Sequence, residues 1–233
     1  MPVGISDIPC KRIYSPIFIR RVFGKIIQKY GVEAVVKERE HQTDREMWVG
    51  ATFALGLMQA GNDPIYCGQG VSGDSPDVYG VSIGNNAKGQ VAEIHRWEIT
   101  EYNEFSTAVD IVDHLIETKM WKGYGPEFSV VCYARRPGQS FVPHDAHTRF
   151  ATKMGKKTYP AVWVVSAVEE PRGGTNHVIA QIWPRVSANL FVPEEVERTL
   201  GKGMKDILKP SFGRSLGFTS MGEEEVEGWG KIN

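Results

Sequence analysis

The sequence predicts an α/β (α+β) fold, in which helices flank a mixed central β-sheet. Segments with helical periodicity precede and separate segments in which apolar residues recur at every second position. Two continuous apolar runs, at residues 128–134 and 161–168, are typical of strands that are covered on both faces. With 233 residues, 41% of them hydrophobic, the chain is long enough for one ordinary core, and we expect a single domain over residues 1–233.

The first predicted helix covers about residues 16–30 and ends at Gly31, a residue type that commonly stops helices. Six basic residues and no acidic one lie between Cys10 and Gly31. Four of them are candidate contacts to the phosphates of a nucleic acid: Arg20, Arg21, Lys25 and Lys29. A solvated polar helix face is the alternative interpretation, and the net charge of −1 gives no global attraction to DNA.

A second, longer helix is predicted from about residue 32 to residue 60. Its apolar positions fall in one narrow sector of a helical wheel, and Glu40 falls in the middle of that sector. The sequence therefore places one carboxylate on the inward face of this helix. The alternative is that the helix frays before Glu40, or that its side chain reaches water.

From Ile65 to Tyr102 the period changes to two, which predicts strands in hairpin order with a Gly/Asn turn at residues 84–89. Asp77 lies on one of these strands and Glu98 on the next, so two carboxylates are expected side by side. At about 4 Å their repulsion is roughly 4 kcal/mol at an intermediate dielectric, so such a pair needs a cation, a shared proton or a basic neighbour.

The remaining elements complete the predicted sheet. A helix is expected from Ser106 to about Trp121, followed by the buried strand 128–134 and a loop or short helix near residues 143–154. The strand 161–168 then pairs with 177–183 as a hairpin. A last helix is predicted from Pro193 to about Leu208, before a loosely held, acidic tail.

Composition bears on the environment of the protein. The chain has no run of 18 apolar residues, and its first residues lack the basic and then apolar layout of a secretion signal. Cys10, Cys67 and Cys132 are odd in number and widely spaced, which argues against a disulfide scaffold and a zinc ribbon. We expect a soluble, cytoplasmic protein with no membrane partner.

The order of elements, with Glu40 in the first long helix, Pro76-Asp77 on one strand and Glu98-x-Thr100 on the next, resembles the PD-(D/E)XK nuclease superfamily, the restriction endonuclease-like proteins. The resemblance implies an αβββαβ core at about residues 32–170, with the basic helix 16–30 before it and a helix and tail at 194–233 after it. It implies that Asp77 and Glu98 bind Mg²⁺, that Glu40 is an accessory acid, and that DNA phosphodiesters are the substrate.

The family's catalytic lysine falls at Thr100 in this chain. Threonine forms hydrogen bonds but carries no charge, and loss of one such electrostatic group costs about 10²- to 10³-fold in rate. Either another basic side chain takes its place, with Lys88 and Arg96 as candidates, or the site is catalytically silent.

Two other functions compete with a magnesium-dependent deoxyribonuclease. The first is an inactive nuclease-like or unrelated α+β domain that binds a protein partner or a second copy of itself. The second is a metal hydrolase built on His144 and His147, with His95 or His177 as a third ligand, because residues three apart share a helix face. Gly68-Gln69-Gly70-Val71-Ser72-Gly73 matches a dinucleotide-loop pattern, but it leads into a strand, which argues against that reading.

Overall fold

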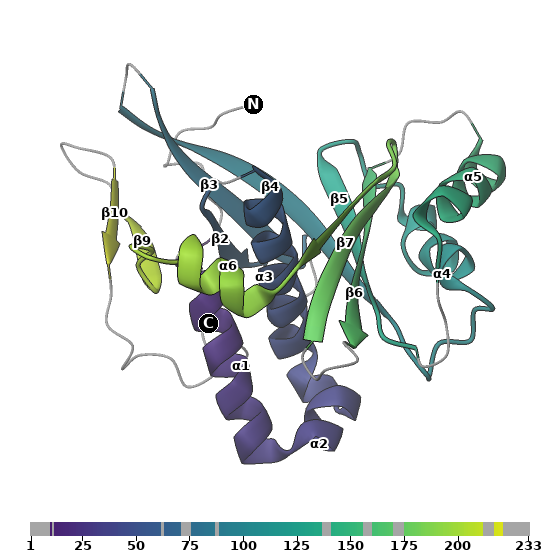
Figure 1. The fold of residues 1–233 in the computed structure, drawn as a ribbon, viewed down its shortest axis with the longest axis horizontal. Helices are drawn as coiled ribbons and strands as arrows, with labels where there is room; N and C mark the ends of the chain where they lie inside the picture. The colour runs from purple at the N-terminus through teal and green to yellow at the C-terminus, as the bar shows by residue number, and fades with distance from the viewer. Residues whose placement is uncertain are drawn as a thin grey trace.

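In a computed structural model of the chain, one large mixed sheet carries helices on both faces (Figure 1). The structure describes residues 10, 12–61, 63–70, 76–86, 89–136, 141–155, 160–169, 175–211 and 217–220. Within these ranges ten strands form the sheet, in the order β10-β9-β1-β2-β3-β4-β5-β6-β7-β8. The predicted mixed α/β fold with flanking helices is therefore confirmed.

The strands follow one another in sequence across most of the sheet. In chain order they are β1 (Ile13–Tyr14), β2 (Ile65–Gln69), β3 (Val78–Asn86), β4 (Gly89–Tyr102), β5 (Phe128–Ala134), β6 (Ala161–Glu169), β7 (Thr175–Trp183), β8 (Ser187–Phe191), β9 (Ile207–Ser211) and β10 (Gly217–Ser220). The β4–β5 and β5–β6 pairs are parallel, and the other neighbours are antiparallel. The hairpin order predicted for residues 65–102 and the pairing of the strands near 161–168 and 177–183 are confirmed.

Each face of the sheet has its own hydrophobic layer. Helices α1 (Pro16–Tyr30), α3 (Gln42–Gly61) and α6 (Pro193–Thr199) cover one face, where they bury alternate residues such as Trp97, Val131 and Ile179. Helices α4 (Ile111–Thr118) and α5 (Pro143–Met154) cover the other face over Tyr102 and Cys132. Because side chains alternate between faces along a strand, β4 to β7 supply both layers.

Helix α1 begins and ends where the sequence predicts. The Ser15 side chain accepts a hydrogen bond from the Phe18 backbone N–H at 3.1 Å, and Gly31 follows the helix with φ of 83°. A positive φ of this size favours glycine, so this stop signal in the sequence has a direct backbone cause.

Three helix predictions need correction. The helix expected at 32–60 is broken into α2 (Val32–Lys37), the 3₁₀ turn η2 (Arg39–His41) and α3, because Glu38 is extended. Helix α4 begins after Asp110, whose carboxylate accepts from two backbone N–H groups, and not at Ser106. The last helix ends at Thr199 and the chain enters β9, since Gly201 and Gly203 interrupt it.

Among the helices within the described ranges, none combines the length and apolar character needed to cross a membrane.

Candidate functional site

The Asp77 and Glu98 carboxylates, which the sequence singles out, contact the same ammonium group. Val78 in β3 pairs with Trp97 in β4, so Asp77, just before β3, lies across from Glu98. Asp77 Oδ2 lies 3.1 Å from Lys119 Nζ, and Glu98 Oε2 lies 3.0 Å from it. These two oxygens therefore lie within about 6 Å of each other. Asp77 Oδ2 also accepts a hydrogen bond from the Ile99 backbone N–H at 2.7 Å, which ties it to β4.

Lys119 is the basic group that the sequence analysis missed. It follows α4 directly, and its side chain is only 10% exposed. Burial by itself would lower the pKa of Lys119, but the Asp77 and Glu98 carboxylates outweigh burial and raise it. The ammonium therefore stays charged at neutral pH and compensates two acids.

Glu98 is the most deeply buried acid of the group, at 1% exposure. Besides Lys119, it accepts a hydrogen bond from the Tyr124 hydroxyl at 2.5 Å. Tyr124 lies between η3 (Met120–Lys122) and β5, so the crossover from β4 to β5 supplies both partners of Glu98. A buried carboxylate normally requires such partners, since an uncompensated buried charge is costly.

Glu46, on α3, is the helical acid that approaches this site. Burial, and then the negative charge of Asp77, raises the pKa of Glu46 to about 7, and Lys119 is near enough to oppose the shift. The Gln42 side-chain amide donates a hydrogen bond to Glu46 Oε1 at 2.7 Å. Glu46 thus occupies the place that the sequence analysis assigned to Glu40.

Glu40 itself does not face the core, so that part of the prediction is wrong. It lies in η2, and its side chain is 69% exposed. The helical wheel assumed one unbroken helix through Glu40, whereas Glu40 lies in the 3₁₀ turn η2 and α3 begins only at Gln42. On a helical wheel of α3, Glu46 lies about 100° from the buried Met47, so the apolar pattern by itself does not select it.

We expect Glu46→Gln to raise the free energy of unfolding above pH 7 by about 3 kcal/mol, because each unit of pKa shift is worth about 1.4 kcal/mol. The folded pKa of Glu46, about 7, exceeds the ordinary value of 4.5. The wild-type fold therefore holds a proton that the unfolded chain releases, and stability falls as the pH rises between these two values. Gln keeps the oxygen that Gln42 contacts, and it cannot ionise.

Urea denaturation between pH 4 and pH 8 measures this effect. Glu117→Gln, at an exposed position of α4, is the control and should leave the pH dependence unchanged. Equal pH slopes for wild type and Glu46→Gln would show that Glu46 ionises normally.

Thr100, at the position where the PD-(D/E)XK pattern has a lysine, pairs with a histidine. Its hydroxyl oxygen lies 3.0 Å from Nε2 of His114, on α4. Burial, and then the charge of Lys119, lowers the pKa of His114, so the imidazole is neutral at pH 7. The positive charge thus comes from α4 and not from β4. Of the two replacements considered from sequence, Arg96 lies in β4 opposite Tyr79, and Lys88 lies outside the described residues.

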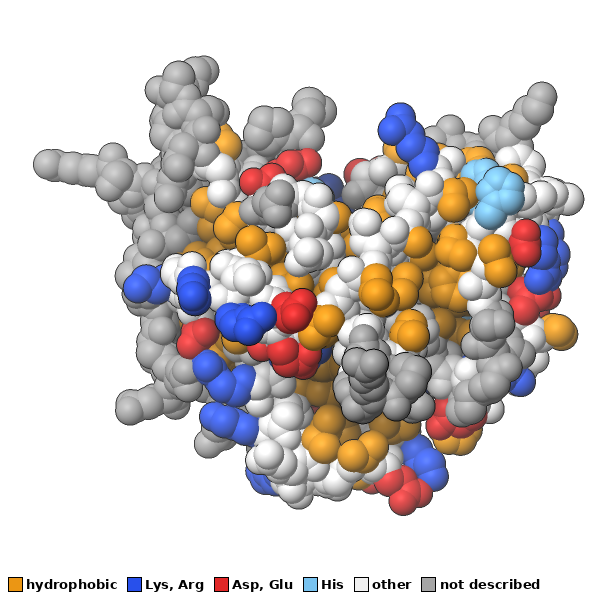
Figure 2. Space-filling model, viewed as in Figure 1, with side chains coloured by type: hydrophobic (Ala, Val, Ile, Leu, Met, Phe, Trp, Pro, Cys, Tyr) orange, Lys and Arg blue, Asp and Glu red, His pale blue; other side chains and the backbone are white. Residues whose placement is uncertain are grey.

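The basic face of α1 is partly neutralised. Arg20 forms ion pairs with Glu194 at 3.0 Å and Glu197 at 2.8 Å, and Arg21 pairs with Asp206 at 2.9 Å. Lys25 and Lys29 are exposed. Figure 2 accordingly shows acidic side chains among the basic ones on the side where Figure 1 places α1 and α6.

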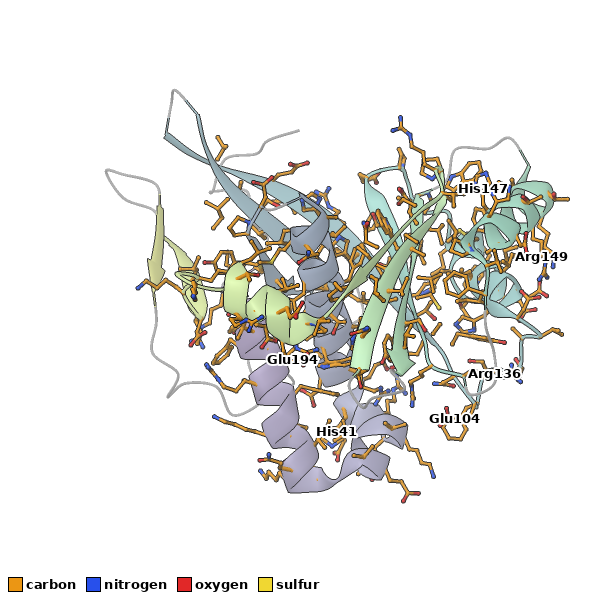
Figure 3. The ribbon with its side chains drawn as sticks, viewed as in Figure 1. His41, Glu104, Arg136, His147, Arg149 and Glu194 are labelled. Carbon is orange, nitrogen blue, oxygen red and sulfur yellow. The ribbon has the colours of Figure 1, made fainter. Side chains whose placement is uncertain are left out.

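His144 and His147 lie in a helix, as the competing metal-site hypothesis requires, but their surroundings do not complete a site. His147 Nδ1 lies 2.8 Å from the Ile182 carbonyl oxygen, with its ring against Trp183, and His144 is exposed (Figure 3). The two proposed third ligands lie elsewhere. His95 bonds to Ser82, and His177 packs against Trp48 and Phe191, on the α3 face of the sheet.

A cavity of about 1080 Å³ lies apart from Asp77 and Glu98. It opens where β5 and β6 end and α4 and α5 begin, and Arg135, Arg136 and Arg149 line it. Each of these guanidinium groups already pairs within the protein, for example Arg149 with Asp110 and Arg135 with Glu101. We therefore place the candidate site at Asp77, Glu98 and Lys119, whose charged groups contact one another, and not at this cavity.

Comparison with known proteins adds no family: no family model, no curated protein and no solved structure matches the chain. The candidate site is thus defined by the residues that the fold brings together, namely Asp77, Glu98, Lys119, Tyr124 and Glu46.

Proposed function

We propose that the chain is a PD-(D/E)XK-like, Mg²⁺-dependent nuclease that hydrolyses DNA phosphodiesters at Asp77 and Glu98. The observation that carries the proposal is the contact of one buried lysine, Lys119, with both carboxylates. The order of elements supports it, because α3, the antiparallel β2, β3 and β4, α4 and the parallel β5 follow an αβββαβ pattern.

The donor set suits a hard divalent cation. Asp77, Glu98 and Glu46 offer carboxylate oxygens, which Mg²⁺ prefers, and they outnumber the single ammonium of Lys119. When Glu46 is ionised, the group carries an excess of negative charge, which favours uptake of a cation. Asp77 and Glu98 would hold the ion, with Glu46 near Asp77. A bound Mg²⁺ would lower the pKa of a coordinated water and neutralise charge on the scissile phosphate.

The protein side chains have separate roles in this proposal. Lys119 supplies the positive charge that the sequence lacks at Thr100, beside the acids where the reaction would take place. Glu46, with a pKa of about 7, is suited to accept a proton from the attacking water near neutral pH. Tyr124 fixes Glu98 through its hydroxyl group and so orients the carboxylate.

The contact to DNA would be largely independent of sequence. Lys25 and Lys29 are exposed on α1, with the Lys29 ammonium 4.9 Å from the centre of the Tyr30 ring, and both can approach phosphates, whereas Arg20 and Arg21 pair with acids. We therefore propose a weak, salt-sensitive backbone contact from α1.

Plasmid nicking in the presence of Mg²⁺ or Mn²⁺ tests the proposed activity. Asp77→Asn should lower the nicking rate by about 10²-fold or more, as expected for loss of one charged group at such a site. The Asn side-chain oxygen can still accept from the Ile99 N–H, so the fold should be retained. Asp63→Asn, an exposed acid just before β2, is the matched control and should leave the rate within about twofold.

Nicking that survives both Asp77→Asn and Glu98→Gln would contradict the proposal. Calorimetry with Mg²⁺ on the same variants gives a readout that does not depend on the choice of DNA. Loss of heat in both variants, with heat retained in Asp63→Asn, is the expected result.

A second candidate function is a catalytically silent domain that binds a protein partner. The observation that favours it is that Glu98 Oε2 already contacts Lys119 and Tyr124 within a mostly buried network. In that case Mg²⁺ would not bind and plasmid would not be cut, yet Lys119 would still stabilise the fold. The same two measurements therefore separate this candidate from the nuclease.

A further inference from the structure

We propose that Glu38, Glu40 and His41 form a binding site for a divalent transition metal of the Zn²⁺ type. The site lies at the junction between α2 and α3, and it is independent of the nuclease proposal. Each of the three side chains offers one ligand atom, and these atoms all lie within 4.8 Å of one another. Within the described ranges of the chain, this is the group in which three metal-capable side chains converge in this way.

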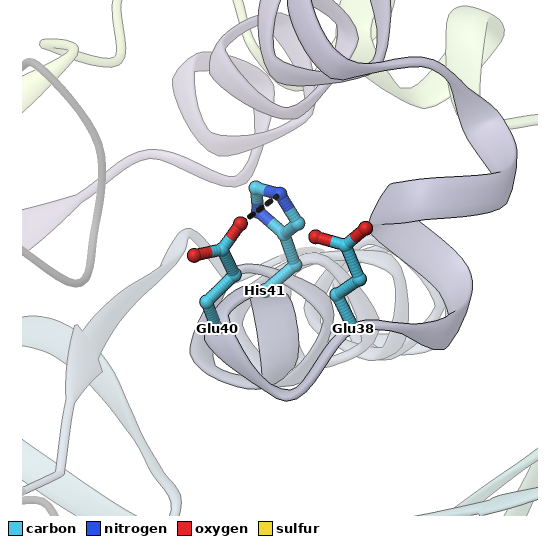
Figure 4. A group of neighbouring side chains, drawn as sticks. All are labelled: Glu38, Glu40 and His41. Carbon is cyan, nitrogen blue, oxygen red and sulfur yellow. Dashed lines mark ion pairs between the residues drawn. The ribbon is translucent and has the colours of Figure 1, made fainter.

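The extended residue Glu38 and the 3₁₀ turn that follows it bring these three side chains together. Glu38 is extended, with φ of −82° and ψ of 137°, and η2 follows at once. Figure 4 shows that the Glu38 and Glu40 carboxylates consequently lie on either side of the His41 imidazole. The His41 Nε2 atom is 3.7 Å from Glu40 Oε1, longer than a hydrogen bond.

His41 is the observation that points to a ligand. The residue is only 5% exposed, and in the part of the chain described here its Nε2 atom is buried without a hydrogen-bond partner. Its other nitrogen, Nδ1, lies 2.9 Å from Asp44 Oδ2. A carboxylate can only accept, so Nδ1 carries a proton, and in the neutral imidazole Nε2 then presents a lone pair toward the two glutamates.

This arrangement is the one that metal-binding histidines adopt. Such a histidine usually donates its second N–H to a carboxylate, which fixes the tautomer and increases ligand basicity. Asp44, itself buried, has this role here, and the Tyr30 ring, 4.9 Å from the imidazole, limits its rotation. The ring is therefore held before any ion arrives.

The ligand types select the metal. One imidazole nitrogen with two carboxylates suits Zn²⁺, whereas Mg²⁺ and Ca²⁺ take oxygen ligands. Glu38 and Glu40 are exposed, so their side chains are free to close on the ion and water can complete the coordination. The cysteines Cys10, Cys67 and Cys132 are buried and do not compete.

Zinc titration of the full chain, first stripped with a chelator, tests the proposal by calorimetry. Wild type should bind one Zn²⁺ with micromolar affinity or better. Glu40→Gln and Glu38→Gln, both at exposed positions, should each weaken binding by at least about tenfold, and Asp44→Asn by about 10- to 100-fold. His41→Gln should abolish binding.

Three controls locate the site. Glu33→Gln, an exposed glutamate of α2, should leave the affinity unchanged. His144→Gln should also leave it unchanged, which excludes α5, and so should Asp77→Asn, which separates this site from the proposed nuclease site. Because the glutamates are exposed, their variants should keep the melting temperature of the metal-free protein.

The proposal is overturned if the wild type takes up no zinc at micromolar concentration, since His41 and Glu40 then form an ion pair only. It is equally overturned if Glu40→Gln and His41→Gln bind as well as wild type, or if His144→Gln removes the binding.

Discussion

Replacing Lys119 with Met should lower the free energy of unfolding at pH 7 by about 3–5 kcal/mol, because the change leaves buried acids without their cation. Glu98 is 1% exposed and Lys119 is 10% exposed at its side chain, so water cannot readily take the place of the ammonium. Met fills a similar volume, and the expected loss is therefore electrostatic. Urea denaturation at pH 7 measures it.

The control for this experiment is three residues further along the chain. Lys122→Met changes an exposed lysine whose ammonium lies over the Tyr124 ring. This substitution should shift the free energy of unfolding by less than about 0.5 kcal/mol. Combining Lys119→Met with Glu98→Gln should recover most of the lost stability, since the buried charge is then removed as well. Equal losses in the single and double variants would mean that Lys119 acts through packing and not through its charge.

Phe53→Ala should destabilise the protein by about 3–5 kcal/mol, the usual cost of removing a buried aromatic ring. Phe53 lies on α3, is 1% exposed, and its ring packs between Trp97 and Trp163 at centroid distances of 5.1 and 5.3 Å. The resulting void would directly adjoin Trp97, the residue before Glu98. We therefore expect the site to loosen together with the core.

Phe105→Ala is the matched control, since Phe105 is 59% exposed and should contribute less than about 0.5 kcal/mol. Thermal unfolding followed by circular dichroism compares the two variants. Similar melting temperatures for them would show that α3 packs on the sheet less tightly than the structure indicates.

Local sequence patterns were sufficient for the strands that carry the acids. The alternation along residues 65–102 predicts neighbouring strands, and the structure has Glu98 on β4 and Asp77 directly before β3, because the period of a strand depends only on the strand itself. The bounds of helix α1 could also be predicted, since a capping serine and a terminating glycine directly flank it in the sequence.

Lys119, the cation of the site, could not be predicted from local sequence patterns. Lys119 is 42 residues from Asp77 and 21 from Glu98, and it reaches them only because α4 carries the chain back along the sheet. The hydrophobic periodicity of the sequence does not predict this long-range contact. Glu46 was missed for a different reason, because it lies beside the buried stripe of α3 and not within it, so helical periodicity does not select it.

The parallel pairing of β4 with β5 has a consequence for folding. The β2, β3 and β4 strands can pair by short connections, but Lys119 and Tyr124 belong to the crossover that must close before β5 pairs beside β4. During synthesis, Asp77 and Glu98 therefore emerge before their cation, and the half-made sheet carries two uncompensated acids. When the crossover folds, Lys119 compensates the two acids and removes this repulsion. Electrostatics therefore favour pairing of β5 with β4 over a separate intermediate made of the β2–β4 hairpins.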